Sequence, residues 1–196
     1  RPDSTFGCDG RNSNRSLILN TMNLVLIGYR GTGKSTIGKL LAEELRLRFV
    51  SLDQEIVVRA RMSIPEIVDQ ESWDYFRDLE QEVVGKFASQ DGLLLDTGGG
   101  VVTREKNIKR LRQNGLVILL ESTVEDIVLR MESDDERPSL TGTQSFTEEV
   151  VQVLSSREPL YRSAADFTIN TSERSPEEAT SDIAAIYREE LGNRTG

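Results

Sequence analysis

One short segment of the sequence has the residue types and spacing of a phosphate-binding loop. Gly28–Ser35 reads Gly-Tyr-Arg-Gly-Thr-Gly-Lys-Ser, which fits the pattern G-x-x-x-x-G-K-[ST] completely. Glycines let the backbone curl so that successive N–H groups point inward at phosphate oxygens. Lys34 is expected to reach the β- and γ-phosphates, and the Ser35 hydroxyl to bind Mg²⁺. The alternative is a glycine-rich turn with a surface lysine, but the complete motif favours nucleotide binding.

The flanking residues place this loop between a strand and a helix. Asn23–Gly28 is a short apolar run, as expected for a parallel strand covered on both faces. Ser35–Leu45 follows, with its apolar residues at helical spacing. The positive end of this helix would then point at the same anion as the loop, which strengthens the prediction.

The rest of the chain alternates between predicted strands and helices. The further strands are Arg48–Ser51, Leu93–Leu95, Leu116–Leu120 and Phe167–Ile169. The further helices are Ser63–Val68, Trp73–Phe87, one closed by Gly115, Thr123–Met131, Thr147–Ala164 and Pro176–Leu191. Strands separated by helices predict one α/β domain over residues 22–196, with a five-stranded parallel sheet flanked by helices in three layers.

Composition excludes several classes of function. The 196 residues carry a net charge of −9, which argues against nucleic acid as a partner, and include no histidine. The general base must therefore be a carboxylate or a lysine, unless the reaction uses none. No apolar run approaches the roughly 20 residues that span a bilayer, so no membrane association is expected. The single cysteine, Cys8, excludes an internal disulfide and fits a reducing, cytoplasmic setting.

Two segments are expected to lie outside the packed core. Arg1–Thr21 is polar and rich in Asn, Ser and Arg, and predicts a disordered N-terminal extension with Met22 as the native start. Glu132–Ser145 is acidic and contains Pro138 and Gly142, which predicts a mobile loop between two helices.

Two charged side chains stand where a small acidic substrate could bind. Arg77 falls on the predicted helix Trp73–Phe87 beside apolar residues, and its guanidinium can form two parallel hydrogen bonds to a carboxylate. The alternative for Arg77 is an i,i+3 pair with Glu80 on a solvated face. Asp53 follows a predicted strand at its carboxyl end, where open α/β sheets place their sites. Its alternative is an N-cap for a helix over Gln54–Arg59.

A run of three glycines follows the third predicted strand. Thr97–Gly100 reads Thr-Gly-Gly-Gly, and consecutive glycines allow the backbone to approach another group closely. The run could also be a simple turn. Its place after a strand of a nucleotide-binding sheet favours close approach to a ligand.

An arginine lies within the acidic loop. Arg137 is flanked by acidic residues and in isolation would be an ordinary solvated charge. The loop that carries it lies between the helix after the fourth predicted strand and the next helix. Folds of the nucleoside-monophosphate-kinase type carry a lid at this place. An arginine there can stabilise the charge that spreads over a transferred phosphoryl group.

Six stretches of the chain occur in the order and spacing of the shikimate kinase family. They are GYRGTGKST (Gly28–Thr36), DQEI (Asp53–Ile56), YFRDLE (Tyr75–Glu80), TGGG (Thr97–Gly100), ERP (Glu136–Pro138) and REPLY (Arg157–Tyr161). From about Leu24 to Leu191, the chain therefore resembles that family. The resemblance implies a P-loop kinase fold with a mobile lid over about residues 132–145. It also implies transfer of the ATP γ-phosphoryl group to the 3-hydroxyl of shikimate, with Mg²⁺ as cofactor.

The resemblance implies specific roles at the acceptor. Asp53 would hydrogen-bond the hydroxyl that is phosphorylated, while Arg77 and Arg157 would bind the substrate carboxylate. The glycines that would line the pocket between acceptor and γ-phosphate are Gly98, Gly99 and Gly100.

The resemblance also implies roles at the nucleotide. Lys34 and Arg137 would stabilise the phosphoryl group, which makes Lys34, Asp53 and Arg137 the expected catalytic residues. The residues that would surround the phosphates are Gly31, Thr32, Gly33, Lys34, Ser35 and Thr36. Arg130 would stack on adenine opposite the loop around Arg174 and Pro176.

The sequence departs from the family at the expected magnesium site. Shikimate kinases as a rule have an aspartate two residues before Asp53, where this chain has Ser51. The apolar run Leu93–Leu95 ends in Asp96, where the family usually has a small residue. Enzymes with this loop hold Mg²⁺ with the loop hydroxyl and an acid at a strand end. Our hypothesis is that Ser35 and Asp96 bind Mg²⁺ or its water ligands. The alternative is that Asp96 only accepts hydrogen bonds from backbone N–H groups of the glycine turn.

Two other functions are compatible with the motifs. A gluconate kinase or a nucleoside-monophosphate kinase shares the loop and the fold, although Arg77 and Arg157 suit a small carboxylate better than a base. A non-catalytic module that senses a metabolite is the second alternative, which the intact Lys34 and Asp53 disfavour. ATP and shikimate are the expected partners of a monomeric chain.

Overall fold

The computed structural model describes residues 22–131 and 146–195 of the chain. The predicted N-terminal extension, the predicted lid and Arg137 lie outside the described residues.

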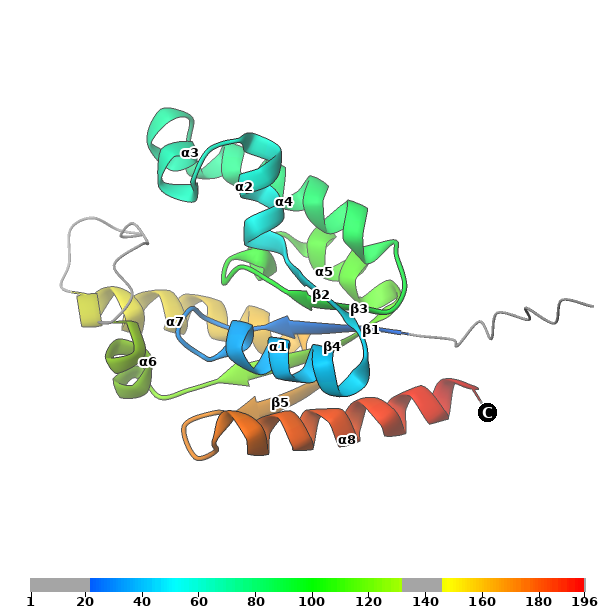
Figure 1. The fold of residues 1–196 in the computed structure, drawn as a ribbon. Helices are drawn as coiled ribbons and strands as arrows, with labels where there is room; N and C mark the ends of the chain where they lie inside the picture. The colour runs from blue at the N-terminus through cyan, green and yellow to red at the C-terminus, as the bar shows by residue number, and fades with distance from the viewer. Residues whose placement is uncertain (1–21, 132–145, 196) are drawn as a thin grey trace, which may run out of the picture.

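Helices and strands alternate along the described chain (Figure 1). The strands are β1 (Asn23–Ile27), β2 (Arg48–Ser51), β3 (Leu93–Asp96), β4 (Gly115–Glu121) and β5 (Phe167–Asn170). The α-helices are α1 (Lys34–Leu45), α2 (Leu52–Ala60), α3 (Ile64–Gln70), α4 (Trp73–Ala88), α5 (Glu105–Gln113), α6 (Val124–Met131), α7 (Phe146–Ala164) and α8 (Pro176–Thr195). A short 3₁₀ turn, η1 (Val101–Thr103), follows β3.

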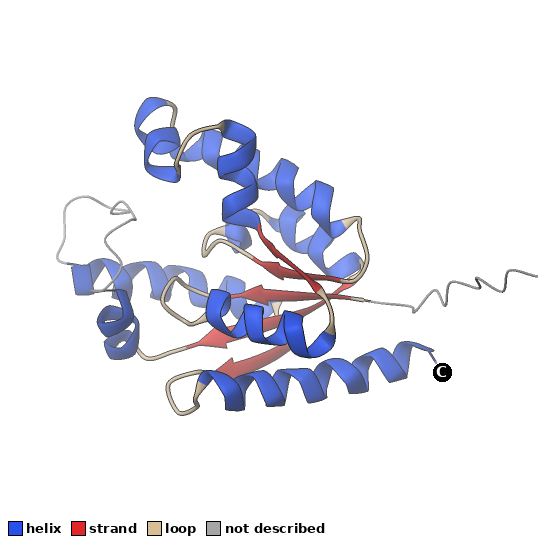
Figure 2. Ribbon diagram, in the orientation of Figure 1, coloured by secondary structure: helices blue, strands red, loops and turns tan. Residues whose placement is uncertain are grey.

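The five strands form one parallel sheet in the order β2-β3-β1-β4-β5. The sheet lies between two layers of helices, and its arrows all point to the same edge (Figure 2). The predicted α/β fold with a five-stranded parallel sheet flanked by helices is therefore confirmed. Because the loops that follow parallel strands converge at that edge, it is where a site is expected.

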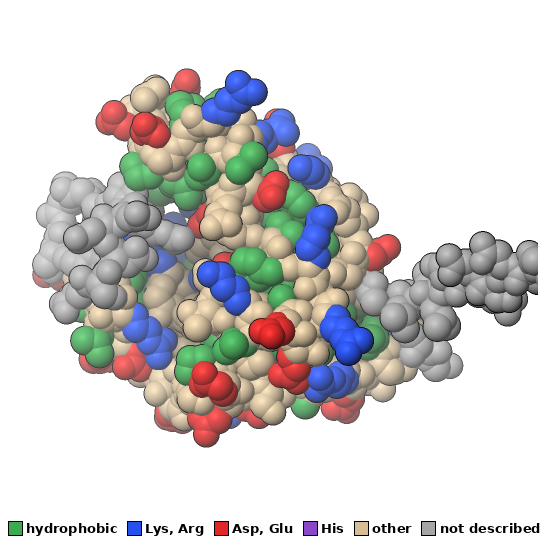
Figure 3. All heavy atoms as spheres, viewed as in Figure 1, with side chains coloured by type: hydrophobic (Ala, Val, Ile, Leu, Met, Phe, Trp, Pro, Cys, Tyr) green, Lys and Arg blue, Asp and Glu red, His purple; other side chains and the backbone are tan. Residues whose placement is uncertain are grey.

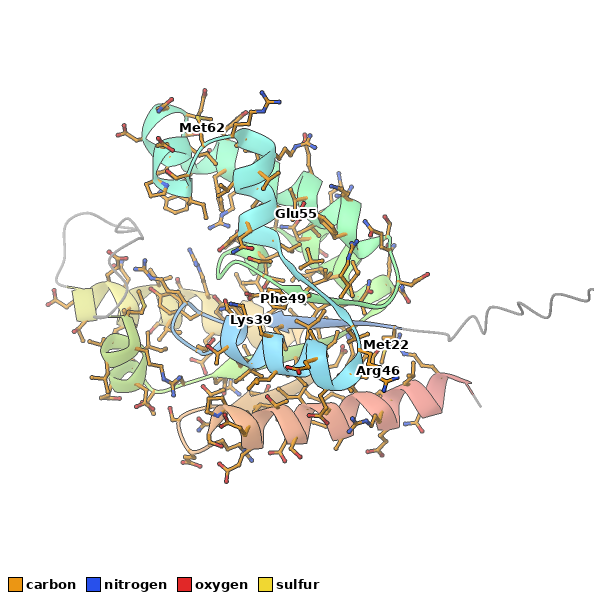
Figure 4. All side chains as sticks on the ribbon, viewed as in Figure 1. Met22, Lys39, Arg46, Phe49, Glu55 and Met62 are labelled. Atoms are coloured by element: carbon orange, nitrogen blue, oxygen red, sulfur yellow. The ribbon has the colours of Figure 1, made fainter. Side chains whose placement is uncertain are left out.

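The sheet carries a separate hydrophobic core on each face. Alternate side chains of β1 face opposite sides, as they must in a strand. Leu24 and Leu26 pack with α1 and α8, whereas Val25 and Ile27 pack with α2, α4, α5 and the end of α7. Phe49 of β2, labelled in Figure 4, packs at the edge of the first of these cores. Both faces of β1 are buried, which explains its continuous apolar sequence.

Element boundaries differ from the predictions by a few residues. The strand predicted to end at Leu95 includes Asp96, so this carboxylate stands at the last position of β3. The prediction that Gly115 closes a helix was wrong: α5 ends at Gln113, and Gly115 is the first residue of β4. A Cβ on Gly115 would lie 2.4 Å from the Leu111 carbonyl oxygen, so glycine is needed there for close approach.

None of the helices within residues 22–131 and 146–195 is long and apolar enough to cross a membrane.

Candidate active site

The glycine-rich loop joins β1 to α1 at the carboxyl edge of the sheet. Gly28, Gly31 and Gly33 have φ values of 141°, 79° and 89°, in the region that favours glycine. A Cβ on Gly28 would lie 2.4 Å from the Leu120 carbonyl oxygen of β4. The backbone conformation therefore disfavours a side chain at all three positions, and packing also excludes one at Gly28.

The loop lysine lies inside the loop that carries it. Its Nζ donates hydrogen bonds to the carbonyl oxygens of Gly28 at 2.9 Å and Tyr29 at 2.8 Å. Thr32 also donates its hydroxyl to Tyr29 O, at 2.8 Å. Lys34 is only 7% exposed, so its charge acts in a partly desolvated site where electrostatic interactions are strong.

Five of the six residues predicted to surround phosphates line one cavity of about 310 Å³, and the exception is Thr32, which is buried behind the loop. Its wall is formed by Arg30, Gly31, Gly33, Lys34, Ser35, Thr36, Ser51, Asp53, Asp96, Thr97, Arg130 and Met131. We call it the phosphate pocket. Positive charge and backbone N–H groups at the start of α1 make it suited to an anion.

Asp96 and the loop hydroxyl are in direct contact within this pocket. Ser35 Oγ donates a hydrogen bond of 2.7 Å to Asp96 Oδ2, and Asp96 is 5% exposed. Ser51 and Asp96 are register partners at the ends of β2 and β3, so the two positions are neighbours on the sheet. Hydroxyl and carboxylate oxygens are the ligand types that Mg²⁺ prefers. Within the described residues no group of three or more acidic or cysteine side chains is arranged to hold a metal ion.

A second pocket adjoins the phosphate pocket at the glycine turn after β3. Its wall is formed by Tyr29, Arg30, Asp53, Ile64, Trp73, Phe76, Arg77, Gly98, Gly99, Gly100 and Arg157. We call it the acceptor pocket. The space-filling view shows a hollow below α2 and α3, beside which Lys and Arg side chains are visible (Figure 3).

Charged side chains pack directly on two of the three glycines, and the third contacts two side chains through its carbonyl oxygen. A Cβ on Gly100 would lie 2.0 Å from Arg77 Nη2, and one on Gly98 would lie 2.6 Å from Asp53 Oδ1. The Gly99 carbonyl accepts hydrogen bonds from Arg157 Nη1 at 3.1 Å and from the Tyr161 hydroxyl. The glycine turn thus brings charged groups together that lie far apart in the sequence.

The purely structural roles considered for Asp53, a helix N-cap, and for Arg77, a solvated ion pair, are both wrong. Ser51, not Asp53, caps α2, because its side chain accepts the Gln54 N–H. Arg77 does pair with Glu80 at 2.7 Å, but Glu80 is buried, so the pair does not lie on a solvated face. The Arg77 guanidinium also lies over the Phe76 ring, 4.9 Å from its centroid. Aromatic and ionic contacts together hold this side chain in place.

Glu80 is a buried carboxyl group between charges of both signs. Burial is the main reason that its pKa rises from 4.5 to about 7, and the Asp53 carboxylate adds to the increase. The charges of Arg77 and Arg157 act in the opposite direction. Among the described residues, Glu80 Oε2 has no hydrogen-bond partner. A buried oxygen without a partner costs less free energy in a protonated, neutral carboxyl group than in a charged one.

The residues expected around adenine are only partly brought together. Arg130 lies in the phosphate pocket and donates to the carbonyl oxygens of Gly31 at 3.2 Å and Thr171 at 3.0 Å. Arg174 instead forms an ion pair with Asp182 at 3.0 Å. Neither Arg174 nor the first residue of α8, Pro176, is in the wall of the phosphate pocket.

The sequence did not indicate several residues that line the pockets or contact the glycine turn. Arg30 and Tyr29 occupy variable positions of the loop motif, where the pattern carries no information. Tyr161 lies four residues after Arg157, one helical turn away, and that spacing could have indicated it. Burial raises the pKa of Tyr161 to about 12, so its hydroxyl stays protonated and donates to the glycine turn.

This fold and site define a P-loop kinase, in which a phosphate-binding loop adjoins a pocket with two arginines and a carboxylate. A family model described as shikimate kinase matches residues 30–188. The chain belongs to the shikimate kinase family.

Individual relatives agree with this assignment. The chain is 45% identical to a shikimate kinase of Pseudomonas putida over 161 residues, which cover 82% of the chain and 93% of the relative. The solved shikimate kinase from Acinetobacter baumannii in complex with shikimate superposes with a TM-score of 0.79 at 34% identity, covering 90% of this chain and 96% of that one. A shikimate kinase from Aquifex aeolicus superposes with a TM-score of 0.73 at 30% identity, covering 86% and 96%.

We expect the free energy of unfolding to fall as pH rises from about 4.5 to about 7, and the Glu80 carboxyl to be the cause. In this window the unfolded chain has lost the Glu80 proton while the folded chain keeps it, so deprotonation favours unfolding. Urea titrations from pH 5 to pH 8 measure the slope. Glu80→Gln should flatten it, and Glu82→Gln on the exposed side of α4 should not. An equal slope in wild type and Glu80→Gln would contradict the assignment.

Proposed function

We propose that the protein transfers the γ-phosphoryl group of ATP to the 3-hydroxyl of shikimate, giving shikimate 3-phosphate and ADP. The observation that carries the proposal is the acceptor pocket, where Arg77, Arg157 and Asp53 meet beside the phosphate pocket. Shikimate presents one carboxylate and neighbouring hydroxyls, which match two cations and one acceptor group. The A. baumannii relative, solved with shikimate, supports the same substrate.

Arg77 and Arg157 would fix the acceptor by its carboxylate. Arg77 is already held by Glu80 and by two aromatic rings, so little side-chain entropy is lost on binding. Asp53 would orient the 3-hydroxyl and accept its proton as the new oxygen–phosphorus bond forms. The backbone of Gly98, Gly99 and Gly100 would line the path between the two substrates. Positioning of this kind supplies much of the rate in phosphoryl transfer.

The nucleotide would bind at the loop. The residues proposed to hold its phosphates are Gly31, Thr32, Gly33, Lys34, Ser35 and Thr36, with Lys34 at the γ-phosphoryl group. Arg137, which lies outside the described residues, would add a second charge there. Arg130, Arg174 and Pro176 are proposed to hold adenine; the contact between Arg130 and Thr171, just before Arg174, supports this.

Ser35 and Asp96 are proposed to hold Mg²⁺. Their hydrogen bond within the phosphate pocket supports the assignment, because enzymes of this class pair the loop hydroxyl with a strand-end aspartate. The ion would neutralise charge on the β- and γ-phosphate oxygens. The register pairing of Ser51 with Asp96 also supports it, since a carboxylate at either strand end would reach the same region.

The protein is proposed to act as a monomer. ATP as a substrate and the absence of a disulfide framework support a cytoplasmic setting.

A panel of acceptors tests the proposed function. ADP release from ATP should depend on shikimate and saturate with it, and should be far slower with gluconate, CMP or AMP. Preference for gluconate or a nucleotide would support one of the alternative kinases. Tight shikimate binding without turnover would instead support a metabolite sensor, and either result would overturn the proposal.

Arg77→Lys should weaken shikimate binding by roughly 2–3 kcal/mol, because lysine keeps the charge but loses the two-pronged contact. ATP affinity should stay near wild type. Trp73 fluorescence should shift on shikimate binding and so measure it, since the Arg77 guanidinium lies 5.6 Å from the centre of that ring. Arg59→Lys, at an exposed site on α2, is the matched control. Equal loss for both substrates, or none for shikimate, would refute the clamp.

Asp96→Asn should lower activity roughly 10- to 100-fold, as for other groups that orient a metal ion, and should raise the Mg²⁺ needed for half-maximal ATP binding. Adding Ser51→Asp should restore part of both, because it returns a carboxylate to the neighbouring strand end. Circular dichroism confirms that each variant is folded. An unchanged Mg²⁺ requirement in Asp96→Asn would show that Asp96 only supports the loop.

A further inference from the structure

Arg30 occupies the junction of the two pockets. Of the described residues that line the phosphate pocket, only Arg30 and Asp53 also line the acceptor pocket. A phosphoryl group that leaves ATP must cross this junction to reach the acceptor hydroxyl. The junction therefore pairs one carboxylate with one guanidinium, and the proposed function gives a role only to the carboxylate.

A buried glutamate holds the Arg30 side chain at this place. Arg30 Nη2 forms an ion pair of 2.8 Å with Glu149 Oε1, in the first turn of α7. The two side chains are 10% and 2% exposed. The guanidinium also lies 5.7 Å from the centre of the Tyr29 ring. The contact spans 119 residues of sequence and ties the phosphate-binding loop to α7.

A contribution to the stability of the fold does not explain why this ion pair is buried. Two charges lose much of their hydration when buried, and an apolar pair of similar size is often as stable or more stable. An oriented guanidinium at a site of phosphoryl transfer has a clear use, because negative charge spreads over the equatorial oxygens in the transition state. With five N–H donors, one guanidinium can keep a carboxylate partner and bind a phosphoryl oxygen at the same time.

We propose that Arg30 is a further catalytic residue, which binds the phosphoryl group as it crosses between the pockets, and that Glu149 is its positioning residue. This inference rests on the proposed function. In the step, a bond forms between the shikimate 3-oxygen and the γ-phosphorus while the bond from that phosphorus to the β–γ bridging oxygen breaks. The hydroxyl proton passes to Asp53, ADP leaves with the bridging oxygen, and Arg30 stays protonated throughout.

The test compares Arg30→Met, Glu149→Gln and the double variant. Arg30→Met should lower kcat roughly 100-fold, as for removal of other preorganised donors, with the KM for shikimate and the Kd for ADP within about threefold of wild type. Glu149→Gln should lower kcat less. The double variant should lose no more than Arg30→Met alone, because Glu149 acts through Arg30. Guanidinium added to Arg30→Ala should restore part of kcat, which a packing role does not predict.

The double variant also guards against misfolding, because it removes the buried carboxylate that Arg30→Met leaves unpaired. A double variant with wild-type kcat would show that Arg30 only neutralises Glu149 and would overturn the inference. Equal losses in kcat and in ADP affinity would do the same. The matched control is Arg188→Met with Glu44→Gln, an exposed ion pair between α1 and α8, which should leave all constants unchanged. Lack of shikimate turnover by wild type would refute the proposed function instead.

Discussion

A contact between two backbones, at the end of β1, positions the rest of the site. Gly28 lies against the Leu120 carbonyl of β4, at a distance that admits no side chain. The loop turns at this point, and α1 begins only after two more glycines with positive φ. Because β1 is the central strand, bonded to β3 and β4, the loop has a fixed relation to the residues that follow both neighbours. Asp96 and the glycine turn lie beside the loop because they end and follow β3, which is paired with β1.

The acceptor pocket is built from charges that do not favour folding. Arg77, Glu80, Asp53 and Arg157 converge on three glycines, and Glu80 is almost fully buried. Removing such groups from water costs free energy, and their mutual attraction offsets only part of that cost. The pKa of about 7 for Glu80 is the sign of the remaining penalty. Two hydrophobic cores, one on each face of the sheet, supply the stability that allows this cluster to exist.

Local patterns predicted the elements and the loop, because periodicity and the loop motif are properties of neighbouring residues. Contacts between distant residues were not predictable in this way. Nothing near Arg30 in the sequence indicates Glu149, and only the folded chain shows that Arg77 lies on Gly100. Ser51 caps α2 in place of Asp53, since one serine at the strand end can accept the free N–H and leave the aspartate for the pocket. The six family motifs indicated the acceptor residues, but not how these residues hold one another.

The register pairing of Ser51 with Asp96 has a consequence for how the family can diverge. The family pattern given in the sequence analysis has the aspartate at the end of β2, where this chain has Ser51, whereas this chain has Asp96 at the end of β3. On the proposal that Asp96 holds Mg²⁺, an exchange of one arrangement for the other keeps a carboxylate at the ion only when the second aspartate appears before the first is lost. An ancestor with aspartate at both positions keeps a carboxylate at the ion throughout, and an ancestor with neither loses it. On the same proposal, the lack of an aspartate at the end of β2 does not by itself indicate that the site is lost, because a carboxylate at the end of β3 reaches the same region.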